Sequence, residues 1–431
     1  MFSGPLRAVW LSVALAGAAP AAFALESPGG TPLGLAEVQR LAEARAPQLQ
    51  ALQARESAAR EMAVSAAQLP DPVLKLGVSN LPVSGEAAWN LGREGMTMRT
   101  VGVMQELTRG ARREARREQA GREADMARAE AGLSLATIRR ESALAWLDVA
   151  WMTRMCTVLG EQISELRLQQ QAAEAAFRSG RGLQAGLLGA ALALGRVEDQ
   201  LAGTERELAS AQARLARWIG EADARRPAAD AESSLAPPAV ATPAEDLRHP
   251  SLLLAERRVA LADASARLAR EDRTPDLAVE VMYGKRGAAF NDMVSVNLVM
   301  PLPWNRAGRQ DRDLAAALAR ADAARAEQDD AQREYRAEEA AARSEWQLNQ
   351  RRLARYDTQL VPLATQQVEA TLAAYRAGTA TLDMTLEARR ALIDTRMERL
   401  RTALDAARSR VRLDYLAPQA GQPTPAQGDA R

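Results

Sequence analysis

The stretch that decides the fold is Leu-Ala-Val-Glu-Val-Met-Tyr-Gly, residues 277–284, in which every second residue is large and apolar, up to Tyr283. Successive side chains of a β-strand point to opposite faces, so this period of two predicts a strand with one apolar face. Three more segments alternate in the same way, at 74–79, 101–108 and 294–302. We expect each strand to span about nine to eleven residues, the length of a strand that crosses a membrane.

Four strands per chain determine the architecture that we expect. An open sheet has two edges with unpaired backbone groups, which cannot lie in lipid, and four strands are too few to close a barrel. Three chains would give about twelve strands, an even number within the range of known outer-membrane barrels. The strands therefore predict a homotrimer with one twelve-stranded transmembrane β-barrel.

Long helices make up most of the remaining chain. Residues 111–177 contain no helix breaker other than tolerated glycines, which is enough for about 100 Å of helix. A second long helix is expected at 307–377, with a kink at Pro362. Shorter helices are expected at 47–68, 183–219, 250–273 and 382–415. Their alanine-rich faces suit a ring of closely packed helices, so the fold class is mainly α with a small β part: a long α-helical barrel plus four strands per chain.

The chain consists of two copies of one pattern, offset by roughly 200 residues, the kind of repeat that identifies an architecture. Ala-Phe-Arg-Ser-Gly at 176–180 recurs as Ala-Tyr-Arg-Ala-Gly at 374–378, and Leu-Pro-Asp at 69–71 as Thr-Pro-Asp at 274–276. The expected divisions are a signal peptide at 1–24, a first repeat at 25–220 with a β-hairpin near 71–108, a linker or equatorial segment at 221–246, a second repeat at 247–416 with a β-hairpin near 276–302, and a disordered tail at 417–431.

The first residues have the three-part pattern of a secretory signal. Arg7 precedes an apolar run at 8–16, and small residues end in Ala22-Phe23-Ala24, so we expect cleavage after Ala24. The alternative is a buried N-terminal helix. The apolar run is too short to span a bilayer. The mature chain is therefore expected outside the cytoplasm.

Composition excludes several classes of function. The 56 Lys and Arg nearly balance the 55 Asp and Glu, which argues against nucleic acid as a partner. A single cysteine, Cys156, and a single histidine, His249, exclude a disulfide framework and a zinc site of His and Cys. Met96, Met98 and Met104 are soft ligands in principle, but methionine near a strand is more often filler. We expect no enzyme activity, no cofactor and no metal site. His249, just before Pro250, is interpreted as a helix-start residue.

With both repeats in view, the chain resembles the TolC family of outer-membrane factors over about 33–416. The resemblance includes the glycine turns of both repeats and Pro-Leu-Pro-Trp-Asn-Arg at 301–306. Gln-Leu-Pro-Asp-Pro at 68–72, Asn-Leu-Pro-Val at 80–83, Met-Thr-Met-Arg at 96–99 and Val-Met-Gln-Glu at 103–106 resemble the branch attached to heavy-metal cation efflux pumps of the RND type.

This resemblance implies a homotrimer in the outer membrane of a Gram-negative bacterium, with a β-barrel in the lipid and an α-barrel through the periplasm. It implies a passive exit duct for heavy-metal cations, whose partners are a periplasmic adaptor (membrane fusion) protein, an inner-membrane RND-type transporter and outer-membrane lipid. Drug efflux and type I protein secretion use the same fold and remain alternatives. A periplasmic coiled-coil scaffold or adaptor is an alternative of another class, which leaves the four strands without a role.

The resemblance also implies the functional residues. Ser179, Gly180 and Arg181 in the first repeat, and Ala377, Gly378 and Thr379 in the second, would be the turns that the adaptor contacts. Glu387, Asp383 and Tyr375 would form the periplasmic gate, where a ring of acidic side chains favours cations. The alternatives are that the turns only end helices and that Glu387 is only a solvated side chain.

Four arginines follow the second strand, at 112, 113, 116 and 117. The roles open for them are contact with lipid phosphates or with the membrane-proximal rim, and exposure to solvent at the start of a helix.

Overall fold

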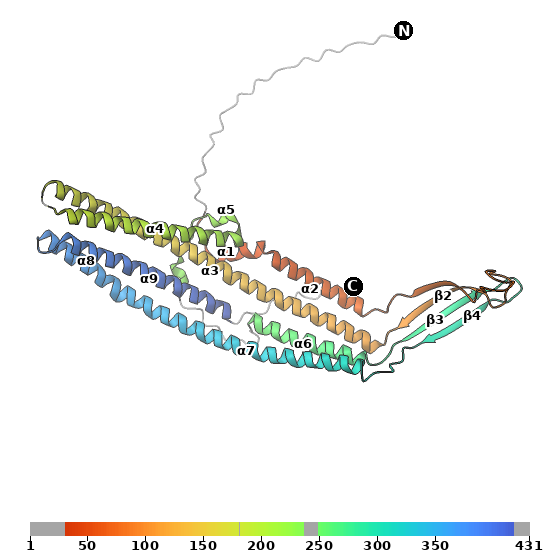
Figure 1. The fold of residues 1–431 in the computed structure, drawn as a ribbon. Helices are drawn as coiled ribbons and strands as arrows, with labels where there is room; N and C mark the ends of the chain where they lie inside the picture. Colours follow the sequence, from red (N-terminus) through yellow and green to blue (C-terminus); the bar gives the residue numbers. More distant parts are fainter. Residues whose placement is uncertain (1–30, 181, 237–248, 418–431) are drawn as a thin grey trace, which may run out of the picture.

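The computed structural model describes residues 31–180, 182–236 and 249–417. The signal peptide at 1–24 and the tail beyond residue 417 lie outside the described residues, as does the linker from 237 to 246. Within the described part the molecule is a long rod, with helices along most of its length and a β-sheet at one end (Figure 1). The division into domains stays a prediction.

Both halves of the chain contain a helix, two strands, a long helical stretch and a further helix in that order, while α1, α5 and η1 of the first half have no counterpart in the described second half. The helices are α1 (Leu35–Arg45), α2 (Pro47–Ala66), α3 (Gly110–Arg178), α4 (Gln184–Ile219), α5 (Glu221–Ala224), α6 (Pro250–Glu271), α7 (Gln310–Arg355), α8 (Val361–Arg376) and α9 (Leu382–Leu416), with a 3₁₀ turn η1 (Ala231–Leu235) and a π-helical turn η2 (Tyr356–Leu360). The strands are β1 (Val73–Ser79), β2 (Met98–Leu107), β3 (Leu277–Lys285) and β4 (Met293–Val299).

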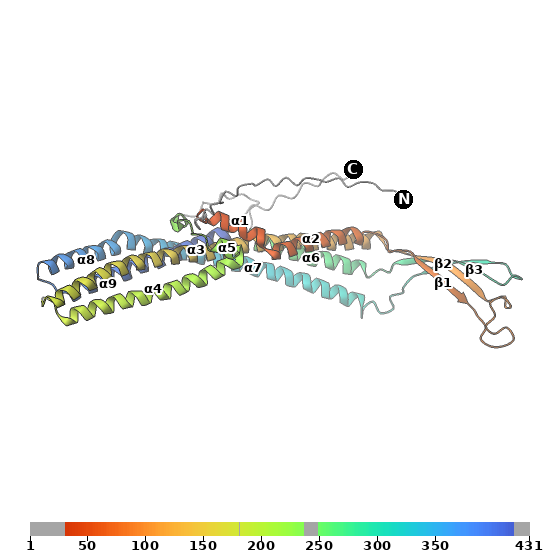
Figure 2. The ribbon, with the colours of Figure 1, turned by 90° about the horizontal axis from the view of Figure 1, so that it is seen from above.

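The long helix α3 organises the bundle. Its 69 residues correspond to about 100 Å, and it contacts α2 and α6 toward the sheet and α4 and α9 toward the other end. In the second half α7 contacts α6 and α9, and α8 continues it beside α9. Figure 2 shows the rod from above, with α2, α6 and α7 nearer the sheet and α4, α8 and α9 at the far end. Each half thus pairs one long helix with two shorter ones.

Small residues allow this packing. Ala143, Ala211, Ala403 and Ala407 have no exposed surface, so backbones approach closely on several sides at once. The largest buried side chain, Trp146, donates its Nε1–H to the carbonyl of Leu33 at 2.8 Å and so ties the N-terminal segment to α3. The hydrophobic core is built mainly from α1, α3, α4 and α9.

A π-helical turn lies just before Pro362, the position at which the sequence predicts a kink. Proline has no N–H to bond to the carbonyl four residues back, and its ring clashes with that carbonyl. The chain relieves this clash in the wider π-helical turn η2 and then continues as α8.

The four strands form one antiparallel sheet in the order β1-β2-β3-β4. The prediction of a mainly helical fold with four strands is confirmed. The expected strand length is wrong for β1 and β4, which have seven residues each. Both are edge strands with a single neighbour within one chain, and Pro72 and Pro301 beside them lack a donor for the ladder. Among the described helices none is long and apolar enough to cross a membrane.

Candidate functional site

The two helix turns have the geometry of a glycine-terminated helix. After α8, Gly378 adopts a φ of 77°, its N–H bonds to the carbonyl of Tyr375, and the N–H of Thr379 bonds to that of Ala374. This pair of bonds is the Schellman motif, in which the left-handed residue favours glycine. After α3, Gly180 has a φ of 70° and its N–H bonds to the carbonyl of Phe177. Arg181, the remaining predicted turn residue, lies outside the described residues.

Both turns lie at the end of the rod opposite the sheet, and the starts of α4 and α9 pack beside each other there (Figures 1 and 2). A Cβ at Gly189 would lie 3.2 Å from Oδ1 of Asp383, and one at Gly186 would lie 3.5 Å from Leu382. Glycines on α4 therefore let α9 approach. Ser179, Gly180, Ala377, Gly378 and Thr379 are all exposed at this tip.

The predicted gate residues lie close to this tip. Asp383 and Glu387 are four positions apart on the first turns of α9, so they share one side of that helix, and both are exposed. Neither forms an ion pair with a described residue. Tyr375 is 39% exposed and lies on α8, on the other side of the turn. Two unneutralised carboxylates at the end of the rod can attract cations.

An ion pair that the sequence did not reveal lies beside them. Arg389, on α9, binds the Glu165 carboxylate of α3 at 3.0 Å, across 224 positions of sequence. This contact joins the two halves of the chain near the tip. Because the partners are so distant in sequence, no local pattern identifies the pair.

The sheet at the other end has one continuous apolar face. The strand register places Leu74, Val103, Val281 and Val296 in one row across all four strands, and Leu76, Val101, Tyr283 and Val294 in the next row. Each of these side chains is between 42% and 73% exposed. A contiguous apolar surface of this kind marks contact with a membrane or with another protein.

The opposite face of the sheet is more polar. It carries Lys75, Gly102, Met282 and Ser295 in one row, and the Lys75 ammonium lies 3.0 Å from the buried carboxylate of Glu280. The sheet is therefore two-faced, as expected from its alternating sequence.

The sheet meets the helices at an ionic junction. The carboxylate of Asp276, just before β3, accepts a hydrogen bond from the backbone N–H of Arg109 at 3.0 Å and pairs with the guanidinium of Arg112. Arg112 also binds Asp272 at 2.6 Å, and Arg109 binds Glu271 at 3.1 Å.

The environment of Asp276 favours its charged form. Burial alone would raise the pKa of this carboxyl, but the bond from the N–H of Arg109 and the Arg112 charge bring its pKa below the ordinary value. Arg112 is therefore ion-paired within the chain to Asp272 and Asp276 and is not a simply solvated side chain. Contact of these arginines with lipid phosphates stays a prediction.

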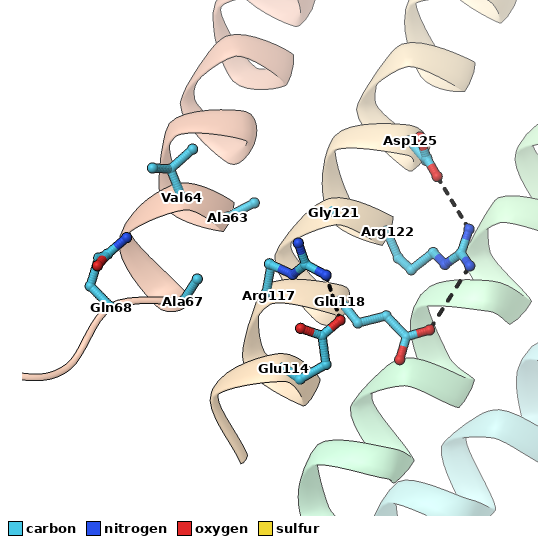
Figure 3. Close-up of a pocket in the computed structure, with 10 residues that line it drawn as sticks. All are labelled: Ala63, Val64, Ala67, Gln68, Glu114, Arg117, Glu118, Gly121, Arg122 and Asp125. Atoms are coloured by element: carbon cyan, nitrogen blue, oxygen red, sulfur yellow. Dashed lines mark hydrogen bonds and ion pairs between the residues drawn. The ribbon is translucent and has the colours of Figure 1, made fainter. Parts of the chain in front are cut away.

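A groove lies between the end of α2 and the start of α3 (Figure 3). Its charged side chains pair along α3: Arg117 with Glu114 at 2.6 Å, and Arg122 with Asp125 at 3.4 Å. Ala63 and Ala67 line the α2 side. The groove thus offers paired charges and small apolar side chains, and the described residues hold no group of three or more His, Cys, Asp or Glu suited to a metal ion.

Comparison with known proteins agrees with this geometry. Residues 245–417 match the protein family described as outer membrane efflux protein. The resemblance inferred from the sequence is thereby confirmed for the second half of the chain. No curated protein matches the sequence.

Solved structures share the fold. The outer membrane protein VceC of Vibrio cholerae has a TM-score of 0.74 at 19% identity, covering 90% of this chain and 96% of that chain. A membrane protein from Pseudomonas aeruginosa has a TM-score of 0.75 at 16% identity, covering 89% of this chain and 90% of that chain. The MtrE outer membrane channel of Neisseria gonorrhoeae, solved in its open state, has a TM-score of 0.71 at 15% identity, covering 90% of this chain and 89% of that chain.

Proposed function

Residues 245–417 match the outer membrane efflux protein family, and on this premise we propose that three copies of the chain form the outer-membrane exit duct of a tripartite efflux pump. The duct performs no chemistry. An inner-membrane transporter of the RND type supplies the free energy, and a periplasmic adaptor joins that transporter to the duct. The helical rod crosses the periplasm and the sheet lies in the outer membrane.

The observation that carries this proposal is the exposed apolar face of the sheet together with its two free edges. Within the described part of one chain, strands β1 and β4 pair on one side only, and lipid cannot satisfy the unpaired backbone groups of an edge. Three copies would pair every edge in a ring of about twelve strands. The apolar rows would then face lipid and the Lys75–Glu280 face would line the pore.

The second part of the proposal concerns the tip of the rod, the end opposite the sheet. The turns at Gly180 and Gly378 end the rod on the periplasmic side, and they are the surface that the adaptor contacts. Glu387 and Asp383, with Tyr375 beyond the turn, form the gate. In three copies these carboxylates would ring the entrance and favour cations over anions.

The proposed cargo is heavy-metal cations. Two features support this proposal: the short sequence motifs around the first hairpin, such as Gln-Leu-Pro-Asp-Pro at 68–72, and the acidic side chains at the tip. The sensitivity of a deletion strain to metal salts and to drugs tests this point. Selective sensitivity to metals supports it, whereas sensitivity to drugs alone, or a defect in secreting a protein, replaces it with one of the alternatives.

A matched pair of substitutions in β4 tests the membrane orientation. Val294 lies on the apolar face and Ser295 on the other, and both side chains are exposed in one chain. An arginine in place of Val294 should cost about 2–4 kcal/mol of insertion free energy if the site faces lipid, and so reduce the detergent-extractable outer-membrane fraction. Ser295→Arg should leave that fraction unchanged and alter conductance. Equal effects on the membrane fraction would contradict the orientation, and a protein that washes off without detergent would favour the scaffold.

A further inference from the structure

The ionic junction joins the two repeats at a fixed level of the rod. In the pairing of β2 with β3, Leu107 lies opposite Leu277, and just beyond this pair the strand of one repeat meets the helix of the other. There Asp276 of the second repeat accepts from the N–H of Arg109, the N-cap residue of α3, and pairs with Arg112 on the first turn. A carboxylate before a strand thus holds the start of the neighbouring long helix.

The chain carries a second set of the same groups, an aspartate before a strand and two arginines at the start of a long helix. Leu-Pro-Asp at 69–71 repeats Thr-Pro-Asp at 274–276, so Asp71 stands before β1 as Asp276 stands before β3. The start of α7 repeats the start of α3. Arg309 is the N-cap residue of α7, as Arg109 is of α3, and Arg312 follows it by three positions.

The side chains of the second set have no partners among the described residues of one chain. The side chains of Asp71, Arg309 and Arg312 are exposed and form no hydrogen bond or ion pair with any other described residue. Asp276, in contrast, is only 6% exposed. The sheet order explains the difference: β1 and β4 are opposite edges, so Asp71 and the start of α7 lie on opposite sides of the chain.

Closure of three copies, which is part of the proposed function, would bring the two sides together. The β4 strand of one copy would pair with the β1 strand of the next, as β2 pairs with β3 inside a chain. The end of β4 leads to α7 and the start of β1 follows Asp71, so both lie on the helix side of the sheet. The contact between copies would then repeat the ion pairs of the contact within a copy. It would not repeat the backbone hydrogen bond, because the N–H of Arg309 already bonds to the carbonyl of Asn305 at 3.1 Å.

We propose that Asp71 of one copy binds the start of α7 in the next copy, through Arg309 and Arg312, and so closes the ring at the base of the barrel. The partner is a second copy of this chain. The carboxylate complements two guanidinium groups and the positive end of a long helix. Its guanidinium partners in the trimer are the counterparts of those that bind Asp276 inside each chain, although the first turn of α7 also carries Asp311 and Asp313, where α3 has no acidic residue.

Charge reversal tests the contact in the full-length protein in detergent. Asp71→Arg should lower the trimer-to-monomer ratio after dilution at least tenfold, and so should Arg309→Asp combined with Arg312→Asp. Joining all three substitutions should restore the ratio to within about threefold of the unaltered protein, because the pair is rebuilt with opposite signs. Asp329→Arg, an exposed reversal farther along α7, is the matched control and should change nothing.

The outcomes separate this proposal from the proposed function. If the unaltered protein is not trimeric, the proposed function fails. If it is trimeric and the reversals leave the ratio unchanged, or their combination is not rescued, the Asp71 contact is wrong and the duct stands.

A second measurement covers the case in which reversal prevents folding. In a Cys156→Ser background, Asp71→Cys with Arg312→Cys should give covalent oligomers with a short bismaleimide, and Asp71→Cys alone should not. Absence of the covalent oligomers from folded trimers would also overturn the contact.

Discussion

The backbone N–H of Arg109 donates to Oδ1 of Asp276 at 3.0 Å, although 167 positions separate the two residues in the sequence. Because the side chain of Asp276 is 4% exposed and Arg112 shares the same carboxylate, this bond fixes the angle between sheet and helices.

Removal of this carboxylate should weaken the fold. Asp276→Ala leaves two arginines without their buried partner, and we expect a loss of about 3–5 kcal/mol in the free energy of unfolding. Asp272→Ala removes a carboxylate that is 42% exposed and binds the same Arg112, so we expect less than about 1 kcal/mol. Denaturant titration followed by circular dichroism measures both. Equal losses would contradict the importance of burial at this junction.

The turn at Gly378 should tolerate residues that adopt a positive φ readily and reject residues that do not. At a φ of 77°, Gly378→Val places a branched side chain in a conformation that it rarely adopts, whereas asparagine is accepted there more readily. We expect Gly378→Val to abolish pump-dependent resistance and Gly378→Asn to keep most of it, with trimers present in both. The minimum inhibitory concentration of the cargo measures the difference. Normal resistance in the valine variant would argue against docking at the turn.

The carboxylate of Glu387 should set the ion preference of the duct. Glu387→Gln removes about three negative charges per trimer from the entrance, so the cation-to-anion permeability ratio in planar bilayers should fall. Asp383→Asn should lower it further. Glu207→Gln, at an exposed carboxylate of α4 away from the tip, serves as the control. A ratio that stays constant in Glu387→Gln would remove this residue from the gate.

The single histidine should make the fold weaker in mild acid. His249 begins α6, where its Nδ1 accepts from the N–H of Ser251, and it packs between Tyr335 and Tyr415. Burial lowers its pKa, a hydrogen bond with the backbone of Tyr415 opposes this in part, and the nearby Arg140 charge lowers the pKa further. The unfolded chain therefore takes up a proton more readily, so stability is complete above about pH 6.5 and falls below it by up to about 1.4 kcal/mol per pH unit until the folded pKa is reached.

Asparagine at position 249 keeps the capping acceptor and removes the titration. His249→Asn should therefore show a much smaller drop in Tm between pH 7.5 and pH 5.5 than the unaltered chain, even if its Tm at pH 7.5 is lower. Equal drops in the two proteins would assign the acid sensitivity to other groups.

Local features of the sequence predicted most of the fold. Alternation located the strands, and the lack of breakers located α3 within a residue or so of its ends. The N-cap role of His249 followed from Pro250 in the same way. The ends of β1 and β4 were misjudged because pairing across an edge depends on a neighbour that the local pattern does not contain.

Contacts between the repeats could not be predicted. Arg112 with Asp276 and Arg389 with Glu165 join positions at least 164 residues apart, and arginine or glutamate on a helix surface looks the same whether paired or solvated. The repeat was the one sequence feature that pointed to these contacts, since Asp71 and Asp276 occupy equivalent positions in the two repeats. Only the sheet order shows which of the two carboxylates finds its arginines inside the chain.

The mass of the detergent-solubilised protein, measured together with its conductance, tests the central claim most directly. Light scattering with correction for bound detergent should give three times the mass of the mature chain, and the same fraction should form ion-conducting pores in planar bilayers. A fraction that has the mass of one chain and still conducts ions would contradict closure of the barrel by three copies.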